Sequence, residues 1–276
     1  LSLLTIAMLV QVFQEFAASS LYNRAIAMAV KEQHPLDELL VPLNKAIAYS
    51  PKHPAYYNTK IDWLSQAYLQ TKDRNYAEQT KQLIETIKPS EPYDRYIILA
   101  QYRNYKDLEE YNKAIIALEE GISKFQWDID FYEAAIMEYA NNGWRVEAAD
   151  PEKAQSYWER GLALYDEVLH RMKLLEKLPE EQLQGRDFNI SLFTRQAVGQ
   201  IFFAKGRYED AVTLLQPFVQ SSLDDPYNRI GVRFYLAALH ALGQHDENLE
   251  KLLIEADENE RMYLDALIQR LSLKNK

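Results

Sequence analysis

Three stretches of the chain share one pattern of small and bulky positions. They are Tyr111-x-x-Ala114-x-x-x-Leu118-x-x-Gly121, Pro151-x-x-Ala154-x-x-x-Trp158-x-x-Gly161 and Tyr208-x-x-Ala211-x-x-x-Leu215-x-x-Phe218. The spacing places the small residue and the bulky residue on the same face of a helix. A small residue lets a neighbouring helix come close, and the bulky residue fills the space beside it. The pattern therefore predicts paired helices that begin at Tyr111, Pro151 and Tyr208.

Apolar residues recur at helical spacing through most of the chain, and Val, Ile and Thr never alternate over a run that is typical of a strand. We therefore predict an all-α protein. Proline should end helices near Pro51, Pro89 and Pro92, and the Asn142-Gly143 pair predicts another helix end. The expected helices span about 55–70, 76–87, 93–105, 108–125, 130–141 and 151–178.

Tyr76, Tyr111, Pro151, Tyr208 and His245 stand at equivalent positions if they all mark helix starts. The step from Pro151 to Tyr208 is longer than the others, which predicts an insertion around residues 174–188. Repeated helix pairs of this kind build a solenoid, and solenoid proteins mostly bind other molecules rather than catalyse reactions.

The composition changes this picture in two ways. The formal net charge is −10, from 31 basic and 41 acidic residues, which argues against nucleic acid as a partner because phosphates need a basic face. The chain has no cysteine. Disulfides, thiolate catalysis and cysteine metal sites are therefore excluded, while the cellular compartment stays open.

The first thirteen residues, LSLLTIAMLVQVF, are apolar and carry no charge. They are too few to cross a bilayer, which needs about 20 residues, and they lack the basic leader of a signal peptide. Two interpretations stay open: a buried helix that packs on the first repeat, and the outer end of a transmembrane helix. The helical pattern continues without a break through Tyr22, which favours the second. Because the chain begins with Leu, we expect it to be a fragment or a processed product.

The run Gly199, Phe202, Lys205-Gly206-Arg207-Tyr208, Ala211, Leu215 and Phe218 resembles the tetratricopeptide repeat, and the stretches around Tyr111 and Ala46–Pro51 match that repeat in part. The resemblance implies a right-handed superhelix of antiparallel helix pairs, with about five or six repeats and one insertion. It implies the following division of the chain: an apolar N-terminal helix (1–31), a first group of repeats (32–178), a connector (179–190), a second group (191–256) and a capping helix (257–276).

A narrower resemblance involves the segments AASSLYNRAIAMA, LLVPLNKAIAYSPKHPAYY and GRDFNISLFTRQAVGQIFFAKGRYEDA. These are similar to the C-terminal tails of O-antigen ligase/polymerase-like membrane proteins of Gram-positive bacteria. The resemblance implies a membrane-associated tail on the extracellular face of a cell-surface polysaccharide polymerase or ligase. The catalytic groups of that family lie in its membrane part, and none matches a position here. The alternative is a free-standing soluble adaptor or signalling protein in the cytoplasm.

Catalytic, cofactor and metal sites are not expected. His240 and His245 are five residues apart and do not share a helical face, and adjacent acids such as Glu109-Glu110 point in different directions on a helix. The motifs G-x-S-x-G, G-x-G-x-x-G and the P-loop are absent from the sequence. We therefore predict that this chain is not an enzyme and holds no cofactor.

The 19 tyrosines are either core residues whose hydroxyl group reaches solvent or side chains that line a concave groove. In the tetratricopeptide family the first helix of each pair lines that groove. The resemblance then points Gln196, Gln200 and Phe203 into the groove, with Phe193 at its edge. The expected occupant is a protein or peptide, and amide and aromatic groups would also suit a glycan or a lipid-linked acceptor.

Overall fold

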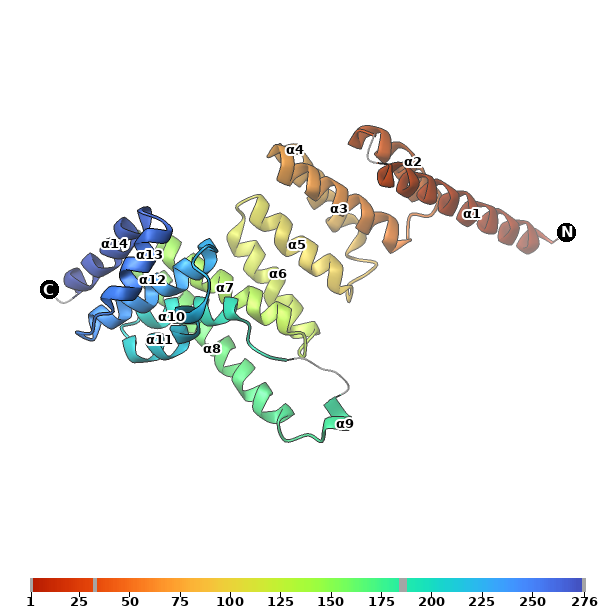
Figure 1. Cartoon of the computed structure of the whole chain (residues 1–276). Helices are drawn as coiled ribbons and strands as arrows, with labels where there is room; N and C mark the ends of the chain where they lie inside the picture. Colours follow the sequence, from red (N-terminus) through yellow and green to blue (C-terminus); the bar gives the residue numbers. More distant parts are fainter. Residues whose placement is uncertain (1, 32–33, 184–187, 275–276) are drawn as a thin grey trace. The chain divides into compact units, whose positions relative to one another are not determined.

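The computed structural model describes residues 2–31, 34–183 and 188–274, and this part of the chain is helical without a strand (Figure 1). The prediction of an all-α protein is confirmed. The helices are α1 (Leu3–Val30), α2 (Leu36–Tyr49), α3 (Pro54–Thr71), α4 (Arg74–Ile87), α5 (Arg95–Asp107), α6 (Tyr111–Lys124), α7 (Ile129–Val146), α8 (Pro151–Leu175), α9 (Glu180–Leu183), α10 (Leu192–Ala204), α11 (Tyr208–Leu215), the 3-10 helix η1 (Gln216–Gln220), α12 (Pro226–Ala241), α13 (Glu247–Ala256) and α14 (Asn259–Lys274).

The helices form two compact units, Leu1–Lys124 and Phe125–Lys276, called unit 1 and unit 2 below. The division falls between α6 and α7, and the predicted grouping of repeats on either side of a connector (179–190) stays a prediction. The physical reason for the division is that α7 packs against α10 as well as against α8, which ties the α7–α8 pair to the helices that follow. Residues 184–187 of the connector lie outside the described residues.

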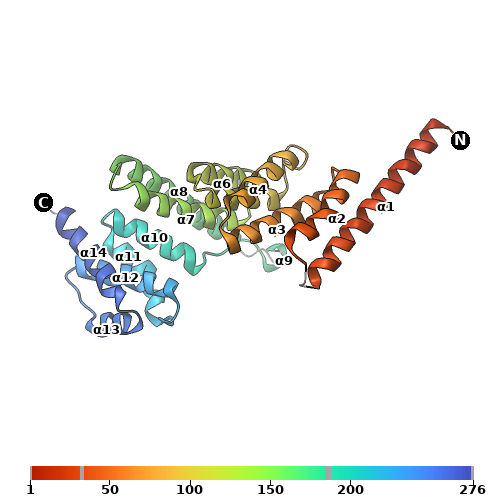
Figure 2. The same ribbon diagram turned by 90° about the horizontal axis from the view of Figure 1, so that it is seen from above.

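Unit 1 consists of three helix pairs, α1–α2, α3–α4 and α5–α6, and neighbouring pairs also contact each other (Figures 1 and 2). Short connections make the two helices of each pair antiparallel. Two clusters of buried side chains form its core. One contains Tyr57, Ile61, Ile84, Ile87, Ile97 and Ala100, and the other contains Ala18, Ala25, Leu43, Ala46 and Tyr56.

Unit 2 contains the pairs α7–α8 and α10–α11, followed by α12, α13 and α14.

Helices α6, α8 and α11 begin at Tyr111, Pro151 and Tyr208, as the spacing predicts. The small and bulky positions of all three patterns are buried, as the pattern also predicts. They are Ala114, Leu118, Gly121, Ala154, Trp158, Gly161, Ala211, Leu215 and Phe218.

A recurring polar residue marks where many of the helices begin. The side chain before the first helical residue accepts a hydrogen bond from a backbone N–H of the first turn, which stabilises a helix by about 1 kcal/mol. Helix starts are therefore readable from local sequence. The capping residues are Asp73, Asp94, Asp128, Asp150, Ser191, Asp225 and Asp246.

The predicted helix end at Asn142-Gly143 is wrong, because α7 continues to Val146. Both residues are buried, and the Asn142 side chain donates to the Glu138 carbonyl at 2.8 Å within the helix. Gly143 has no room for a side chain, since an added Cβ would overlap the indole of Trp158 on α8. The glycine is thus a contact point between two helices rather than a stop signal.

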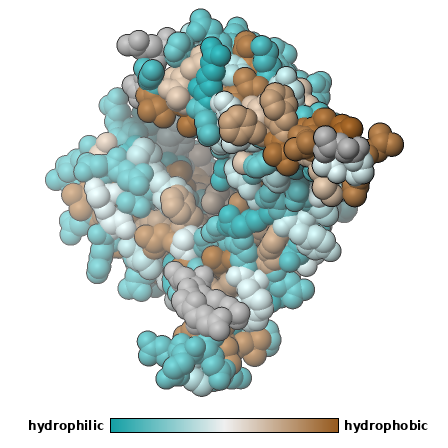
Figure 3. All heavy atoms as spheres, turned by 90° about the vertical axis from the view of Figure 1, so that its right-hand side faces the viewer, coloured by the Kyte–Doolittle hydropathy of each residue, from teal (hydrophilic) through white to brown (hydrophobic). Residues whose placement is uncertain are grey.

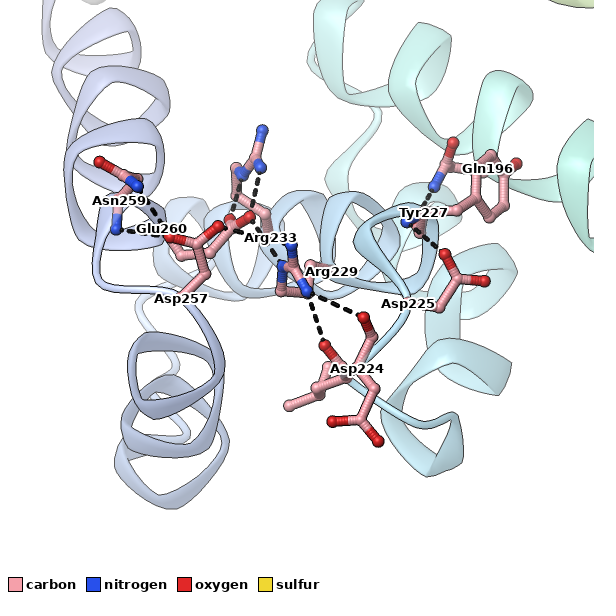
Figure 4. A network of polar contacts seen from close by, with 10 residues as sticks. Gln196, Asp224, Asp225, Tyr227, Arg229, Arg233, Asp257, Asn259 and Glu260 are labelled. Atoms are coloured by element: carbon pink, nitrogen blue, oxygen red, sulfur yellow. Dashed lines mark hydrogen bonds and ion pairs between the residues drawn. The ribbon is translucent and has the colours of Figure 1, made fainter.

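The end of unit 2 is held by a polar network (Figure 4). Arg233 of α12 donates two hydrogen bonds, of 2.6 and 2.7 Å, to the buried carboxylate of Glu260 on α14. Arg229 donates to the Leu223 carbonyl at 2.9 Å and approaches Asp257 at 3.4 Å. These paired charges join α14 to α12 with the two-pronged geometry that arginine and carboxylate favour.

Substituting Gly143→Ala should destabilise unit 2 by about 1–3 kcal/mol, because the new methyl group overpacks against Trp158. Glycine to alanine in a free helix would instead add stability, so the sign of the change is diagnostic. Urea unfolding followed by circular dichroism measures it. Adding Trp158→Phe should recover part of the loss, since the smaller ring makes room and the Trp158 Nε1 has no hydrogen-bond partner to lose. An increase in stability for Gly143→Ala alone would contradict this account.

Candidate functional site

The four predicted groove residues have different environments on α10. Phe193 is 51% exposed, and Gln200 is partly buried. Gln196 and Phe203 are buried, at 5% and 2% exposure. The structure therefore does not place the four side chains together on one open surface.

The two buried residues hold α10 against its neighbours. The Gln196 Nε2 donates to the Tyr227 carbonyl at 2.6 Å, at the start of α12 (Figure 4). The Phe203 ring packs edge-on against Phe234 of α12, with 5.5 Å between ring centroids. The expectation that Gln196 and Phe203 face a groove is corrected by this packing. Phe193 and Gln200 stay predictions as partner-binding residues.

A pocket of about 380 Å³ lies in unit 1 between α3 and α5, the first helices of two successive pairs. Its volume is in the range of sites that hold small molecules. Buried Ile61 and Ala100 contribute apolar surface, and the other lining residues are mostly polar. The lining residues are Ile61, Asp62, Ser65, Gln66, Leu69, Tyr96, Ala100, Tyr102, Arg103, Lys106 and Asp107. We call this space the α3–α5 pocket.

Two tyrosine hydroxyl groups bridge α3 and α5. Near the start of α5, the Tyr96 hydroxyl donates to Asp62 Oδ1 at 2.6 Å and lies 3.1 Å from the Asn58 carbonyl. At the last residue of α5, the Tyr68 hydroxyl donates to the Asp107 carbonyl at 2.8 Å. These long side chains connect the helices through their polar tips, which leaves space between the two bridges.

The α3–α5 pocket carries two acids and two bases. Burial raises the pKa of Asp107, and nearby Lys72 and Lys106 oppose that shift. Burial and the hydrogen bond to Asp62 raise the pKa of Tyr96, so its hydroxyl stays protonated. The exposed guanidinium of Arg103 makes no hydrogen bond or ion pair with the described part of the chain. The pocket can thus hold an apolar group beside an anionic one.

Sequence reasoning did not select these residues, although α5 carried a signal. Tyr96, Ala100, Arg103 and Asp107 recur at the spacing of one helical face. A stripe that mixes a small residue with charged and aromatic residues differs from the all-apolar stripe of a core helix. That mixture could have marked α5 as a helix with one functional face.

The second notable surface is the first half of α1. Large apolar residues from Leu3 to Phe16 are exposed, with fractions from 49% for Ile6 to 88% for Leu3. The space-filling view shows brown, apolar atoms gathered into such a patch (Figure 3). The second half of α1 packs on α2 through buried Ala18 and Ala25. The interpretation of residues 1–13 as a buried helix is therefore not supported.

Among the described residues, α1 is the one helix that is long and apolar enough to cross a membrane. Glu15 is its first charged residue, and the Ser50 hydroxyl donates to the Glu15 carboxylate, 3.0 Å from each oxygen. Tyr22 lies further along α1, with its ring 4.8 Å from that of Tyr56. The exposed and packed halves of α1 thus meet at a defined polar contact.

No group of three or more His, Asp or Glu residues in the described ranges is placed to hold a metal ion. The rings of His240 and His245 stack edge-on, with 5.0 Å between centroids. Absence of a cofactor stays an expectation.

No protein-family model matches the chain, and no curated protein matches it.

Substituting Asp107→Asn should stabilise unit 1 at neutral pH. Because the folded pKa of Asp107 is raised, the folded chain binds this proton more tightly than the unfolded chain. Ionised Asp107 therefore costs stability at neutral pH, and this cost fades as the pH falls through the raised pKa. Hydrogen exchange of the α5 amides at several pH values measures the effect.

Glu110→Gln is the matched control. Hydrogen bonds from Lys113 and Lys81 lower the pKa of Glu110, so its ionised form stabilises the fold and this stability is lost as the pH falls through the folded pKa. The control should therefore lower protection at neutral pH, with a smaller difference in acid. Faster exchange in Asp107→Asn than in the unsubstituted chain at neutral pH would refute the assignment.

Proposed function

We propose that this chain is a non-catalytic tetratricopeptide-like scaffold that binds a protein or peptide partner. The observation that carries the proposal is the α3–α5 pocket. It lies between the first helices of successive pairs, which is where the family resemblance places a partner groove. The proposed occupant is an extended peptide that seats one apolar side chain near Ile61 and Ala100 and an acidic group at Arg103.

The packing of helix pairs supports this architecture. Gly199 of α10 faces Leu215 of α11, and Gly231 of α12 faces Phe218 of η1, at distances that leave no room for a side chain on either glycine. These are contacts of a small residue with a bulky one, both within a pair and between successive pairs. They support the proposed stacking of helix pairs, while the right-handed superhelix of about five or six repeats rests on the sequence resemblance. The acidic net charge does not favour nucleic acid as a partner.

We further propose that α1 attaches the scaffold to a membrane. A helix that is apolar all round and yet exposed to water is unusual for a surface helix, which normally has one apolar stripe. The finer proposal, a tail on the extracellular face of a polysaccharide polymerase or ligase, is supported by the sequence resemblance alone. The alternative, a soluble cytoplasmic adaptor, requires another protein to cover the first half of α1.

An array of random-sequence peptides, followed by fluorescence polarisation of the peptides retained, should identify peptides that combine an apolar and an acidic residue. Arg103→Glu should weaken their binding by about tenfold, as expected for a reversed charge at a partly desolvated contact. Arg74→Glu is the control, because Arg74 is an exposed arginine of unit 1 outside the pocket.

A glycan array run in parallel tests the other class of ligand. Retention of glycans without peptides, with the same loss in Arg103→Glu, would replace the peptide proposal. Equal peptide binding by the Arg103 and Arg74 variants would remove the α3–α5 pocket from the function. Circular dichroism of both variants shows whether the fold is kept.

The chain should float with lipid vesicles in a density gradient. The double substitution Leu9→Asp and Phe13→Asp should reduce the bound fraction by at least about tenfold, because each buried carboxylate is costly in hydrocarbon. The matched control is Ile116→Asp with Leu252→Asp, which changes two exposed apolar residues outside α1. Flotation that is lost equally in both double variants, or that never occurs, would contradict membrane attachment through α1.

A further inference from the structure

The exposed apolar residues of α1 lie on all sides of the helix. Leu4, Val12, Leu9, Ile6 and Leu3 illustrate this, since steps of 100° place them at about 0°, 80°, 140°, 200° and 260° around the helix axis, and each is at least 49% exposed. A protein partner or a second copy of the chain would cover one side and leave the others in water. Lipid chains surround a helix completely, so the distribution of these residues fits a bilayer better than a protein surface.

The absence of charge defines how much of the helix suits hydrocarbon. From Ser2 to Gln14 the chain has no charged side chain, and Glu15 is the first. The segment Leu3–Gln14 has a length of about 18 Å at 1.5 Å per residue, compared with about 15 Å for half of the hydrocarbon core. This segment is long enough to reach the middle of a bilayer.

The contact between Glu15 and Ser50 limits how deeply the segment Leu3–Gln14 can enter a bilayer. Ser50 follows α2, so its bond to Glu15 places the end of α2 beside α1 at this level. Deeper entry would bring the carboxylate into hydrocarbon, and it would carry the end of α2 with it. Both changes are unfavourable, because a charged group at membrane depth costs several kcal/mol.

The residues next to Ser50 are of the types found at membrane surfaces. Tyr49 is 45% exposed, and Lys52 and His53 are exposed in the loop that leads to α3. Tyrosine is enriched where hydrocarbon meets headgroups, and lysine is attracted to anionic lipid. Phe16 of α1, which is 73% exposed, lies one residue beyond Glu15 and adds a second aromatic ring at this level.

We propose that the bilayer surface meets unit 1 at the Glu15–Ser50 contact, with Leu3–Gln14 in hydrocarbon and the loop Tyr49–His53 on the headgroups. This inference rests on the proposed membrane attachment and specifies its depth and the lipid contacts. The loop then sets the orientation of unit 1, because two separate segments rest on the membrane.

The cysteine-free sequence allows single labels to test the depth. Cysteine variants at Leu4, Leu9, Phe13, Ser20 and Val30 of the full chain, each carrying a nitroxide, are bound to vesicles of phosphatidylcholine and phosphatidylglycerol. Accessibility to oxygen and to a water-soluble nickel chelate is then measured. The first three labels should be protected from nickel, with the deepest at Leu4, and the last two should stay accessible.

Each departure from that profile has a defined meaning. Leu9 and Phe13 lie on the side of the helix opposite Leu4, so protection that differs between Leu4 and these two labels would show a helix lying flat on the surface. A transition elsewhere than between Phe13 and Ser20 would exclude Glu15 as the boundary. Either result overturns the inference while leaving membrane attachment intact. Failure of the unlabelled chain to bind vesicles would overturn the attachment itself. Protection without vesicles, with a doubled mass, would assign the surface to a second copy.

Two exposed lysines test the loop contact: Lys52 lies in the loop that follows Ser50, and Lys31 lies at the far end of α1. Lys52→Glu should weaken binding to vesicles that contain phosphatidylglycerol by about fivefold or more, and it should change little with phosphatidylcholine alone. Lys31→Glu is the matched control, because Lys31 caps the far end of α1 and is also exposed. Equal effects of the two substitutions would overturn the headgroup contact of the loop.

Discussion

Close packing of a small residue against a bulky one is the contact on which the helix pairs depend. Where Gly143 faces Trp158, or Gly199 faces Leu215, the two helix backbones approach so closely that no second side chain fits between them. Such contacts are sensitive to a single methylene, since protein interiors are as densely packed as organic crystals. They also set which helix lies beside which, and so determine the surfaces that remain open to a partner.

The same kinds of helices meet differently in the two units. In unit 2, α10 and α12 are joined by aromatic rings and by the amide of Gln196, which fill the space between them. In unit 1, α3 and α5 are bridged by the hydroxyl tips of Tyr68 and Tyr96, whose side chains are long. The α3–α5 pocket lies between these helices, and buried Ile61 and Ala100 also line it.

Helix α1 is continuous, but its first half is exposed and its second half packs on α2. Its second half has small buried residues, Ala18 and Ala25, which let α2 come close. Its first half has large apolar residues that no other helix of unit 1 covers. The Glu15–Ser50 contact separates the two halves, because it satisfies the first charge on the helix at the point where packing by protein begins. Helical propensity continues across this point, so the backbone does not change although the surroundings do.

The sequence by itself determined the features that depend on neighbours along the chain. The helical class, the starts at Tyr111, Pro151 and Tyr208 and the buried face of each pattern follow from the spacing of small and bulky residues, and Asp150 also caps the helix that begins at Pro151. Spacing and capping act within a few residues. What only the tertiary structure decided depends on residues far apart in sequence. The helix continues through Asn142-Gly143, where the glycine packs against the Trp158 indole of another helix, and buried Gln196 donates to the Tyr227 carbonyl. The α3–α5 pocket and the exposed half of α1 likewise depend on how far neighbouring helices reach, which no local pattern encodes.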